Sequence, residues 1–172
     1  MRSISTNIIL ALAALVALSA CGAKGTFRDG VFLGQEAAYR VDPPAAPWER
    51  VSFAGNDLAW AGPDGELLAV NAVCQEHGDP SLKVLTDHLL MGFENRRIRE
   101  REEVRLAGRS ALRTRAEAQM DGVPVELELT VLKKDGCVYD LTYLASPSRF
   151  DARLGAYRAV LKSFEAVAGG DR

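Results

Sequence analysis

The chain has 172 residues, with 21 Lys and Arg against 23 Asp and Glu and a formal net charge of −2. This length fits one domain that buries its own core. The near balance of charge excludes a polybasic protein, so we expect neither nucleic acid as a partner nor an electrostatic attachment to lipid headgroups.

Residues 1–20 have the order of a secretory signal peptide. Arg2 is their only charge, and an aliphatic run of about 11 residues follows at positions 8–18. A permanent membrane span needs roughly 20 such residues, although an uncleaved anchor stays the alternative. The motif Leu18-Ser19-Ala20-Cys21 matches the bacterial lipobox. We therefore expect the chain to be cleaved before Cys21 and its thiol to be acylated. The mature lipoprotein would carry two or three acyl chains, which attach it stably to a membrane, whereas a single chain would bind only weakly.

The segment after the cleavage site indicates the cellular location of the protein and contains little regular structure. Residues 21–37 are rich in Gly and small or polar types and are expected to form a lipidated tether and lead-in segment, with a short edge strand at Val31-Phe32-Leu33. Gly22 stands where inner-membrane lipoproteins of enteric bacteria carry Asp. This favours the outer membrane over the inner, with the protein facing the periplasm. Residues 38–168 are assigned to a single domain.

The first hairpin of the domain is marked by its turn. Pro63-Asp64-Gly65 has the residues of a tight turn with Gly in the left-handed position. It sets Trp60 opposite Leu68 and Leu58 opposite Val70, so one face of the hairpin is apolar.

A polar loop and a helix follow this hairpin. Glu76-His77-Gly78-Asp79 holds the residue types of a metal site, but no second His cluster completes a ligand set, and we predict no metal. Asp79 followed by Pro80 is expected to cap the helix. His88 lies beside the apolar stripe and is interpreted as a boundary residue. The stripe itself recurs at helical spacing and consists of Leu82, Leu85, Leu89 and Phe93.

An Arg-rich stretch at residues 96–115 contains eight Arg with Glu interleaved. A turn around Gly108 would let strands on either side pair Glu103 with Arg113 and Arg99 with Glu117. The favoured interpretation is therefore a solvated, ion-paired sheet surface. The alternative is a partner-binding surface, because Arg is favoured at interfaces. Its candidate residues are Arg99, Arg101, Arg113 and Arg115.

Two more turns set the register of the following strands. A two-residue turn at Asp121-Gly122 gives a hairpin whose inner pairs are all small or apolar, with Arg115 opposite Glu128 on the outer face. A turn at Lys134-Asp135-Gly136 is expected to continue that apolar face. A register shifted by one residue would place Leu129 against Asp140 or Thr142. The pairs predicted from the second turn are Val131–Tyr139, Leu129–Leu141 and Leu127–Tyr143.

The last element is a second amphipathic helix that begins near Ser146-Pro147. Its apolar residues step by four, three, four and three along the chain, which places them on one side of a helix that lies on the sheet. These residues are Phe150, Leu154, Tyr157, Leu161 and Phe164.

Two cysteines remain once lipidation has used Cys21. Cys74 and Cys137 each stand at the end of a predicted strand and share its parity with core residues. Secretion places them where disulfides persist. We predict a bond between them that closes a loop of about 60 residues and stabilises the fold by about 4 kcal/mol. Two buried free thiols are the alternative.

This order of elements resembles PsbP-like domains. A strand that ends in Pro-Pro, a Trp shortly afterwards (Trp48), a hairpin, a helix, a four-strand meander and a closing amphipathic helix span residues 38–166. The resemblance, shared with the photosystem II extrinsic protein and a Ran-binding import factor, implies an α+β fold. We expect an antiparallel sheet of about six to seven strands covered by two helices. No photosystem-docking or Ran-binding signature accompanies it, so the family's functions do not transfer.

No nucleophile elbow, phosphate loop, dinucleotide fingerprint or zinc-protease motif occurs in the chain. We therefore predict a non-catalytic protein without a cofactor. The favoured hypothesis is a membrane-anchored adaptor or assembly factor that binds a protein of an envelope complex. The alternative is a periplasmic carrier that holds a lipid or another apolar ligand between helix and sheet.

Overall fold

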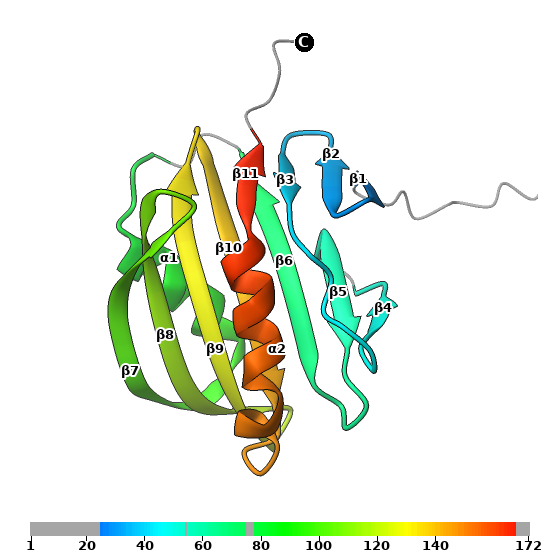
Figure 1. Ribbon diagram of the computed structural model, residues 1–172. Helices are drawn as coiled ribbons and strands as arrows, with labels where there is room; N and C mark the ends of the chain where they lie inside the picture. Colours follow the sequence, from blue (N-terminus) through cyan, green and yellow to red (C-terminus); the bar gives the residue numbers. More distant parts are fainter. Residues whose placement is uncertain (1–24, 54, 75–77, 168–172) are drawn as a thin grey trace, which may run out of the picture.

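The computed structural model describes residues 25–53, 55–74 and 78–167. The predictions for the signal peptide, for Cys21 and for Glu76 and His77 fall outside these residues. Within them, two antiparallel sheets and two α-helices form the predicted α+β fold, but only the larger of the two sheets was predicted (Figure 1). No helix in this part of the chain is long and apolar enough to cross a membrane.

The larger sheet has seven antiparallel strands in the order β4-β5-β6-β10-β9-β8-β7 (Figure 1). The turn Pro63-Asp64-Gly65 sets Trp60 opposite Leu68 and Leu58 opposite Val70, as predicted. Strands β7 to β10, the last four of this sheet along the chain, form a meander, which brings β10 back beside β6. The strands are β4 (Glu49–Val51), β5 (Leu58–Ala61), β6 (Leu67–Val73), β7 (Glu94–Leu106), β8 (Arg109–Met120), β9 (Val123–Lys134) and β10 (Cys137–Ala145).

A second sheet of four strands joins the two ends of the described chain. Its order is β1-β2-β3-β11, so the last strand pairs antiparallel with β3. The prediction of an edge strand at Val31-Phe32-Leu33 is wrong in its position, because β2 lies between β1 and β3. Phe32 stacks on Tyr39 with 4.9 Å between ring centroids, and both rings are buried. The strands are β1 (Gly25–Arg28), β2 (Val31–Gly34), β3 (Ala38–Arg40) and β11 (Glu165–Val167).

The two helices cover opposite faces of the seven-stranded sheet (Figure 1). On the α1 face, Leu90 belongs to a buried cluster with Leu127 and Leu129. On the α2 face, Tyr157 belongs to a second cluster that includes Leu132. The sheet therefore lies between two apolar layers. The elements are α1 (Leu82–Leu89), the 3-10 turn η1 (Leu90–Gly92) and α2 (Phe150–Ser163).

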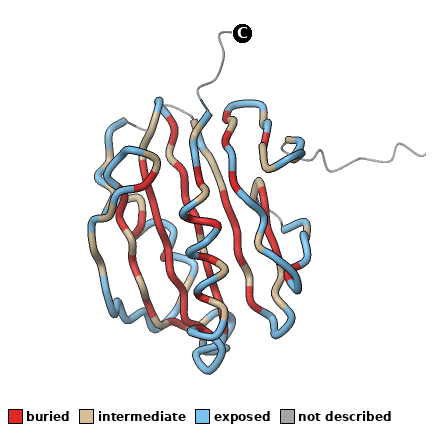
Figure 2. The backbone as a smooth tube through the Cα atoms, viewed as in Figure 1, coloured by how far each residue is buried: buried red, intermediate tan, exposed pale blue. Residues whose placement is uncertain are grey.

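Strand β9 is buried along most of its length, because each of its faces is covered (Figure 2). This burial explains a wrong prediction. The hairpin at Asp121-Gly122 pairs as predicted, but Leu129 lies opposite Thr142 and not opposite Leu141. The turn after β9 has two residues, Asp135-Gly136, both with positive φ, so the pairing shifts by one. The observed register pairs Leu129 with Thr142 and Val131 with Asp140. Because both faces of β9 are buried, polar residues are buried as well, and matching apolar with apolar residues does not select the register.

Both helices begin later than predicted. The N-cap of α1 is Ser81, whose Oγ accepts a hydrogen bond from the Val84 N–H at 3.3 Å, and not Asp79. Before α2, the Ser146 carbonyl accepts bonds from the N–H groups three and four residues later, which makes a turn first. The apolar stripe predicted for α2 is buried throughout. On α1 the predicted stripe is not buried: Leu89 is exposed and the other three residues are half-buried, whereas Thr86 and Leu90 are buried.

Aromatic side chains fill the space between α2 and the sheet. The Tyr157 hydroxyl donates to the Leu141 carbonyl at 3.1 Å and shares a hydrogen bond of 2.9 Å with Thr130. The Tyr143 hydroxyl donates to the Phe150 carbonyl at 2.9 Å. Burial raises the pKa of Tyr157 and of Tyr143 well above the ordinary tyrosine value. The helix is thus held by apolar packing and by hydroxyl groups that all have partners.

Candidate partner-binding surfaces

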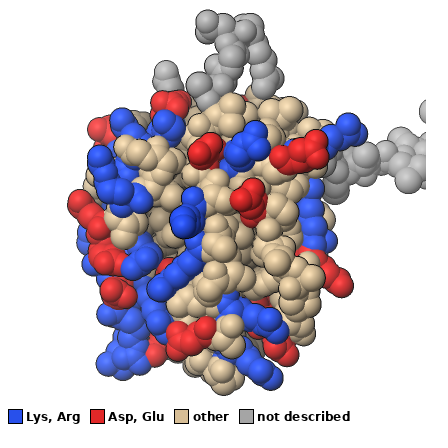
Figure 3. Space-filling model, viewed as in Figure 1, with Lys and Arg blue, Asp and Glu red and all other residues tan. Residues whose placement is uncertain are grey.

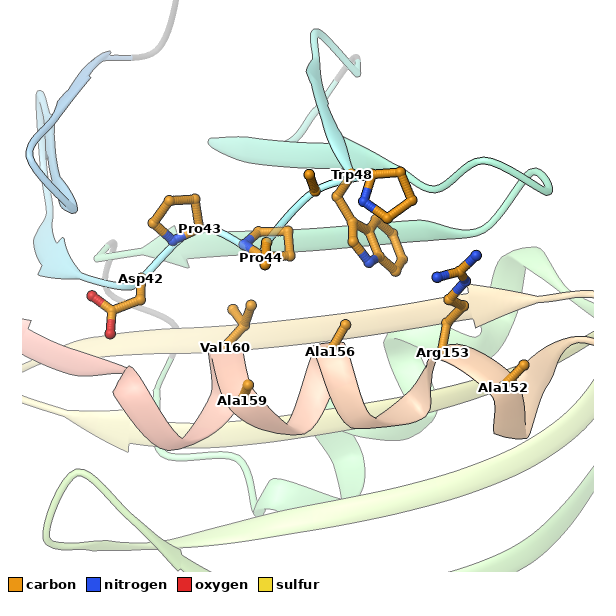
Figure 4. A pocket seen from close by; sticks show the side chains of 12 residues that line it. Asp42, Pro43, Pro44, Trp48, Ala152, Arg153, Ala156, Ala159 and Val160 are labelled. Atoms are coloured by element: carbon orange, nitrogen blue, oxygen red, sulfur yellow. The ribbon is translucent and has the colours of Figure 1, made fainter.

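A groove of about 460 Å³ lies between the loop 42–48 and one side of α2 (Figure 4). The loop follows β3 and carries the Pro-Pro pair of the sequence analysis. Small side chains at helical spacing form the opposite wall, so the helix backbone lies close to the groove. The walls are formed by Pro43, Pro44 and Pro47 on the loop and by Ala152, Ala156 and Ala159 on the helix.

The loop is fixed to the rest of the fold at both ends. At one end the Asp42 N–H donates to the Ser163 Oγ at 2.9 Å. At the other end Trp48 is buried and lies edge-on to Tyr143, with ring centroids 6.4 Å apart. Prolines between these anchors restrict the backbone. The groove is therefore formed before any partner binds.

Opposite charges stand at the two ends of the groove (Figure 4). Arg153 lies at one end, with its guanidinium 3.8 Å from the buried Glu66 carboxylate and 3.9 Å from Asp64. Asp42 lies at the other end and is exposed. The middle of the groove is apolar, the exposed Asp42 lies at one end, and at the other end Arg153 is already paired with Glu66 and Asp64.

This groove was not predicted from the sequence, where the Pro-Pro pair and Trp48 indicated only the fold. The signal was present in the uncharged run of Pro and Ala at positions 43–47 and in the alanine spacing of residues 152–159. About 110 residues separate the two segments, and nothing in either predicts that they meet.

A second surface is the strand β7, called here the β7 edge and comprising residues 94–106. It is the last strand on one side of the seven-stranded sheet and is exposed over most of its length. Acidic and basic side chains lie together on this side of the molecule (left in Figure 3). The stretch is therefore a charged sheet edge, as the interleaved Glu and Arg predict.

Each of the four arginines proposed for partner binding has an acidic neighbour. Their ion pairs favour the ion-paired surface of the sequence analysis, while a role in binding a partner stays a prediction. They also divide between the two faces of the sheet, since Arg101 reaches Asp87 on α1 whereas Arg115 reaches Asp151 on α2. The pairs are Arg99–Glu117, Arg101–Asp87 (2.6 Å), Arg113–Glu102 and Arg115–Glu126 (2.6 Å).

One predicted pair is wrong. Arg113 binds Glu102 and not Glu103. The turn between β7 and β8 consists of two residues, Ala107-Gly108, which both have positive φ. This turn places Glu102 directly opposite Arg113 and leaves Glu103 opposite Leu112.

Arg115 connects the charged surface to the second helix. Its Nε lies 2.6 Å from Glu126, its Nη2 lies 3.1 Å from Asp151, and its guanidinium lies 4.4 Å from the centroid of the Phe150 ring. The hydrogen bond to Glu126 raises the pKa of Arg115. Glu126 is only 7% exposed, so Arg115 supplies the positive charge that a buried carboxylate needs.

A disulfide between Cys74 and Cys137 joins the end of β6 to the start of β10, as predicted.

The predicted helix cap Asp79 instead forms an ion pair with Lys133, and this contact lowers the pKa of Asp79. His88 is exposed on α1. Within the described residues no group of three or more His, Cys, Asp and Glu side chains is arranged to hold a metal ion.

The sequence matches no protein-family model and none of the curated proteins. Solved structures are similar in fold. LpqN, described as involved in cell envelope biogenesis of Mycobacterium tuberculosis, superposes with a TM-score of 0.56 at 14% identity and covers 78% of this chain and 87% of its own. CyanoP, the PsbP protein of Synechocystis, gives 0.51 at 13% identity over 89% and 99%. PA94 of Pseudomonas aeruginosa, a protein of unknown function, gives 0.51 at 10% identity over 83% and 97%.

A seven-stranded antiparallel sheet lies between two helices, and the C-terminal strand β11 pairs with β3 in a second sheet. This arrangement is an α+β domain with the PsbP-like fold. A similar fold occurs in the cyanobacterial PsbP protein and in a mycobacterial protein involved in cell envelope biogenesis. Identities this low establish the architecture only, so the function has to be argued from the surfaces of this chain.

Proposed function

We propose that this protein is a lipid-anchored, non-catalytic accessory factor of a bacterial envelope complex, and that it binds its partner in the groove between loop 42–48 and α2. The lipobox at Cys21 supports the anchor, and the role of LpqN in envelope biogenesis supports the setting. The observation that carries the proposal is the groove itself, which is preformed and lined by prolines and alanines.

The chemistry of the groove favours an extended, apolar peptide segment of a partner protein. Its volume of about 460 Å³ fits a few side chains and not a folded element. Small wall residues allow a backbone to come close, as alanine and glycine do between packed elements. The exposed Asp42 at one end favours a basic residue at that end of the segment.

The carrier hypothesis places a ligand between helix and sheet, where the structure offers less support. Tyr143, Tyr157 and Phe150 fill that layer, and the two hydroxyl groups have hydrogen-bond partners. A lipid chain would have to displace close-packed aromatic rings. The groove on the outside of α2 is the more accessible place for an apolar ligand, so its occupant decides between the two hypotheses.

Photocrosslinking in intact cells tests the proposal. We would place p-benzoylphenylalanine at Ala159, which is exposed in the groove wall, and at Lys162, which is exposed on the same helix away from the lining. We expect a protein adduct from Ala159 and none from Lys162. An Ala156→Trp variant, which fills the groove, should abolish the adduct, whereas a Lys162→Trp variant should not.

The other outcomes are informative as well. A lipid adduct at Ala159 in place of a protein would favour the carrier. Equal adducts at both positions, or no adduct at either, would contradict the groove as the binding site. A Cys21→Ala variant recovered in the membrane fraction like the wild type would contradict the lipid anchor.

A further inference from the structure

The β7 edge is long and open. It has 13 residues, and among the strands that the structure describes it pairs with β8 alone. An open strand of this length presents unpaired backbone groups to other strands. Charged side chains and bulges usually prevent such pairing. The question is whether any strand would complement these charges.

The charges of the β7 edge complement those of a second copy of the same strand. If two copies lie antiparallel with Arg99 opposite Glu100, every charged pair in the aligned stretch joins opposite signs and no like charges meet. Shifting the register by one residue in one direction places Arg99 opposite Arg101, and in the other direction Arg97 opposite Arg101. The complementary pairs that share a face are Arg96–Glu103, Arg97–Glu102 and Arg99–Glu100. Glu94 and Arg105 do not pair, because a second irregularity between Glu94 and Arg97 places Glu94 opposite Gln119 on the α2 face, whereas Arg105 lies opposite Ser110 on the α1 face.

Between residues 96 and 103 the faces of the strand agree with this register, because a β-bulge lies between Ile98 and Glu100. Residues paired across a two-fold axis between antiparallel strands must lie on the same face of the joined sheet. In a regular strand Arg97 and Glu102 would lie on opposite faces. In β7 an extra residue between Ile98 and Glu100 reverses the alternation, so Arg97 lies opposite Glu117 and Glu102 opposite Arg113, both on the α2 face.

The same test holds on the other face of the sheet. Ile98 lies opposite the buried Ala116, which packs on the α1 side, and Arg101 reaches Asp87 on α1. The register pairs Ile98 with Arg101 of the second copy, so both members again share a face. Arg96 donates to the Leu90 carbonyl of η1 at 2.9 Å, which places it on the α1 side as well.

We propose that β7 pairs antiparallel with β7 of a second copy of this chain, with Arg99 opposite Glu100 across the two-fold axis. The two seven-stranded sheets then form one continuous sheet, and the bulge lies at the axis, where each copy meets the identical bulge of the other. Each exposed ion pair adds little affinity, but together they select this partner and this register. Arg99 and Arg101, predicted to bind a partner, belong to this interface.

Disulfide trapping tests the register directly. Two differently tagged full-length copies, one with Arg96→Cys and one with Glu103→Cys, are produced together, and the membranes are treated with copper phenanthroline. Residues opposite one another in antiparallel strands lie about 4.5–5.5 Å apart at Cα, within disulfide range. The control combines Arg96→Cys with Arg105→Cys, which moves one cysteine by two residues along the same face of the strand. We expect at least tenfold less mixed disulfide from this control than from Arg96→Cys with Glu103→Cys.

Charge reversal provides the second measurement. Glu100→Arg in both cysteine-bearing copies places like charges at the axis and should reduce the mixed disulfide at least tenfold. Glu100→Arg in one copy with Arg99→Glu in the other restores opposite charges and should restore the bond. Glu36→Arg, an exposed change of the same charge away from β7, should have no effect.

Equal yields from the two cysteine registers, or a yield that Glu100→Arg leaves unchanged, would overturn the proposal. The groove on α2 takes no part in this experiment, so its result and the photocrosslinking result are independent.

Discussion

Removing the disulfide should destabilise the fold by an amount that the structure predicts. Cys74 and Cys137 are joined at the end of the ladder in which Val73 pairs with Val138. The bond closes a loop with a sequence separation of 63, which contains α1 and strands β7 to β9. In the folded state the ladder already holds the two strands together, so the bond acts mainly by restricting the unfolded chain.

The chain-entropy relation for a loop of this length gives about 4 kcal/mol at 25 °C. This is a large share of the 5–15 kcal/mol that stabilises a typical domain. A domain of this size loses roughly 2–4 °C in Tm for each kcal/mol. The double variant Cys74→Ala with Cys137→Ala should therefore melt roughly 8–16 °C below the wild type.

Urea unfolding of a lipid-free Cys21→Ala form, with and without the double substitution, measures this loss. Reduction of the wild-type bond with dithiothreitol should reproduce it, and the reductant should leave the double variant unchanged. A loss below about 1 kcal/mol would refute the reasoning, because it would mean that the unfolded chain gains no freedom when the loop opens.

Three further predictions concern the buried tyrosines, the buried Glu126 and the lipid anchor. Tyr143 and Tyr157 have raised pKa values in the fold and the ordinary value of 10.0 when unfolded, so the native state binds more protons at alkaline pH. Stability should fall as pH rises above 10, and melting curves should show a shallower fall for Tyr157→Phe. Arg115→Ala leaves Glu126 buried without its cation and should cost about 2 kcal/mol in urea unfolding, part of which an added Glu126→Gln should recover. Cys21→Ala should move the protein from the membrane fraction to the supernatant, as immunoblotting would show.

Turn residues made part of the register predictable. Asp121-Gly122 and Pro63-Asp64-Gly65 each specify a turn geometry, and the strands on either side pair as predicted. The hairpin after β9 was mispredicted because both faces of the strand are buried and one of them carries polar residues such as Glu128 and Thr130, so polar and apolar residues pair in the observed register. Alternating apolar and polar residues indicate which face of a strand is buried. When a second helix layer covers the other face as well, this alternation no longer indicates the register.

The surfaces were harder to predict than the core. The hairpins determine the orders β4-β5-β6 and β7-β8-β9-β10, but no turn determines that β6 pairs with β10. Strand β11 likewise pairs with β3 across more than a hundred residues, and it has only three residues. The bulge at Ile98 leaves no mark in the sequence, yet it decides which face each charge of the β7 edge occupies. Local patterns indicate elements, and the meeting of distant short segments depends on the whole fold.

The buried carboxylates of β9 have a consequence before folding. Strand β9 runs through the sheet, and Glu126 and Glu128 interrupt what would otherwise be a segment rich in Val and Leu. In the folded protein these two charges need Arg115 and Arg158 as partners. In the unfolded chain they act as gatekeepers, because a charged segment stacks poorly into intermolecular sheets. The same two glutamates thus form ion pairs in the folded protein and reduce aggregation while the chain is still unfolded.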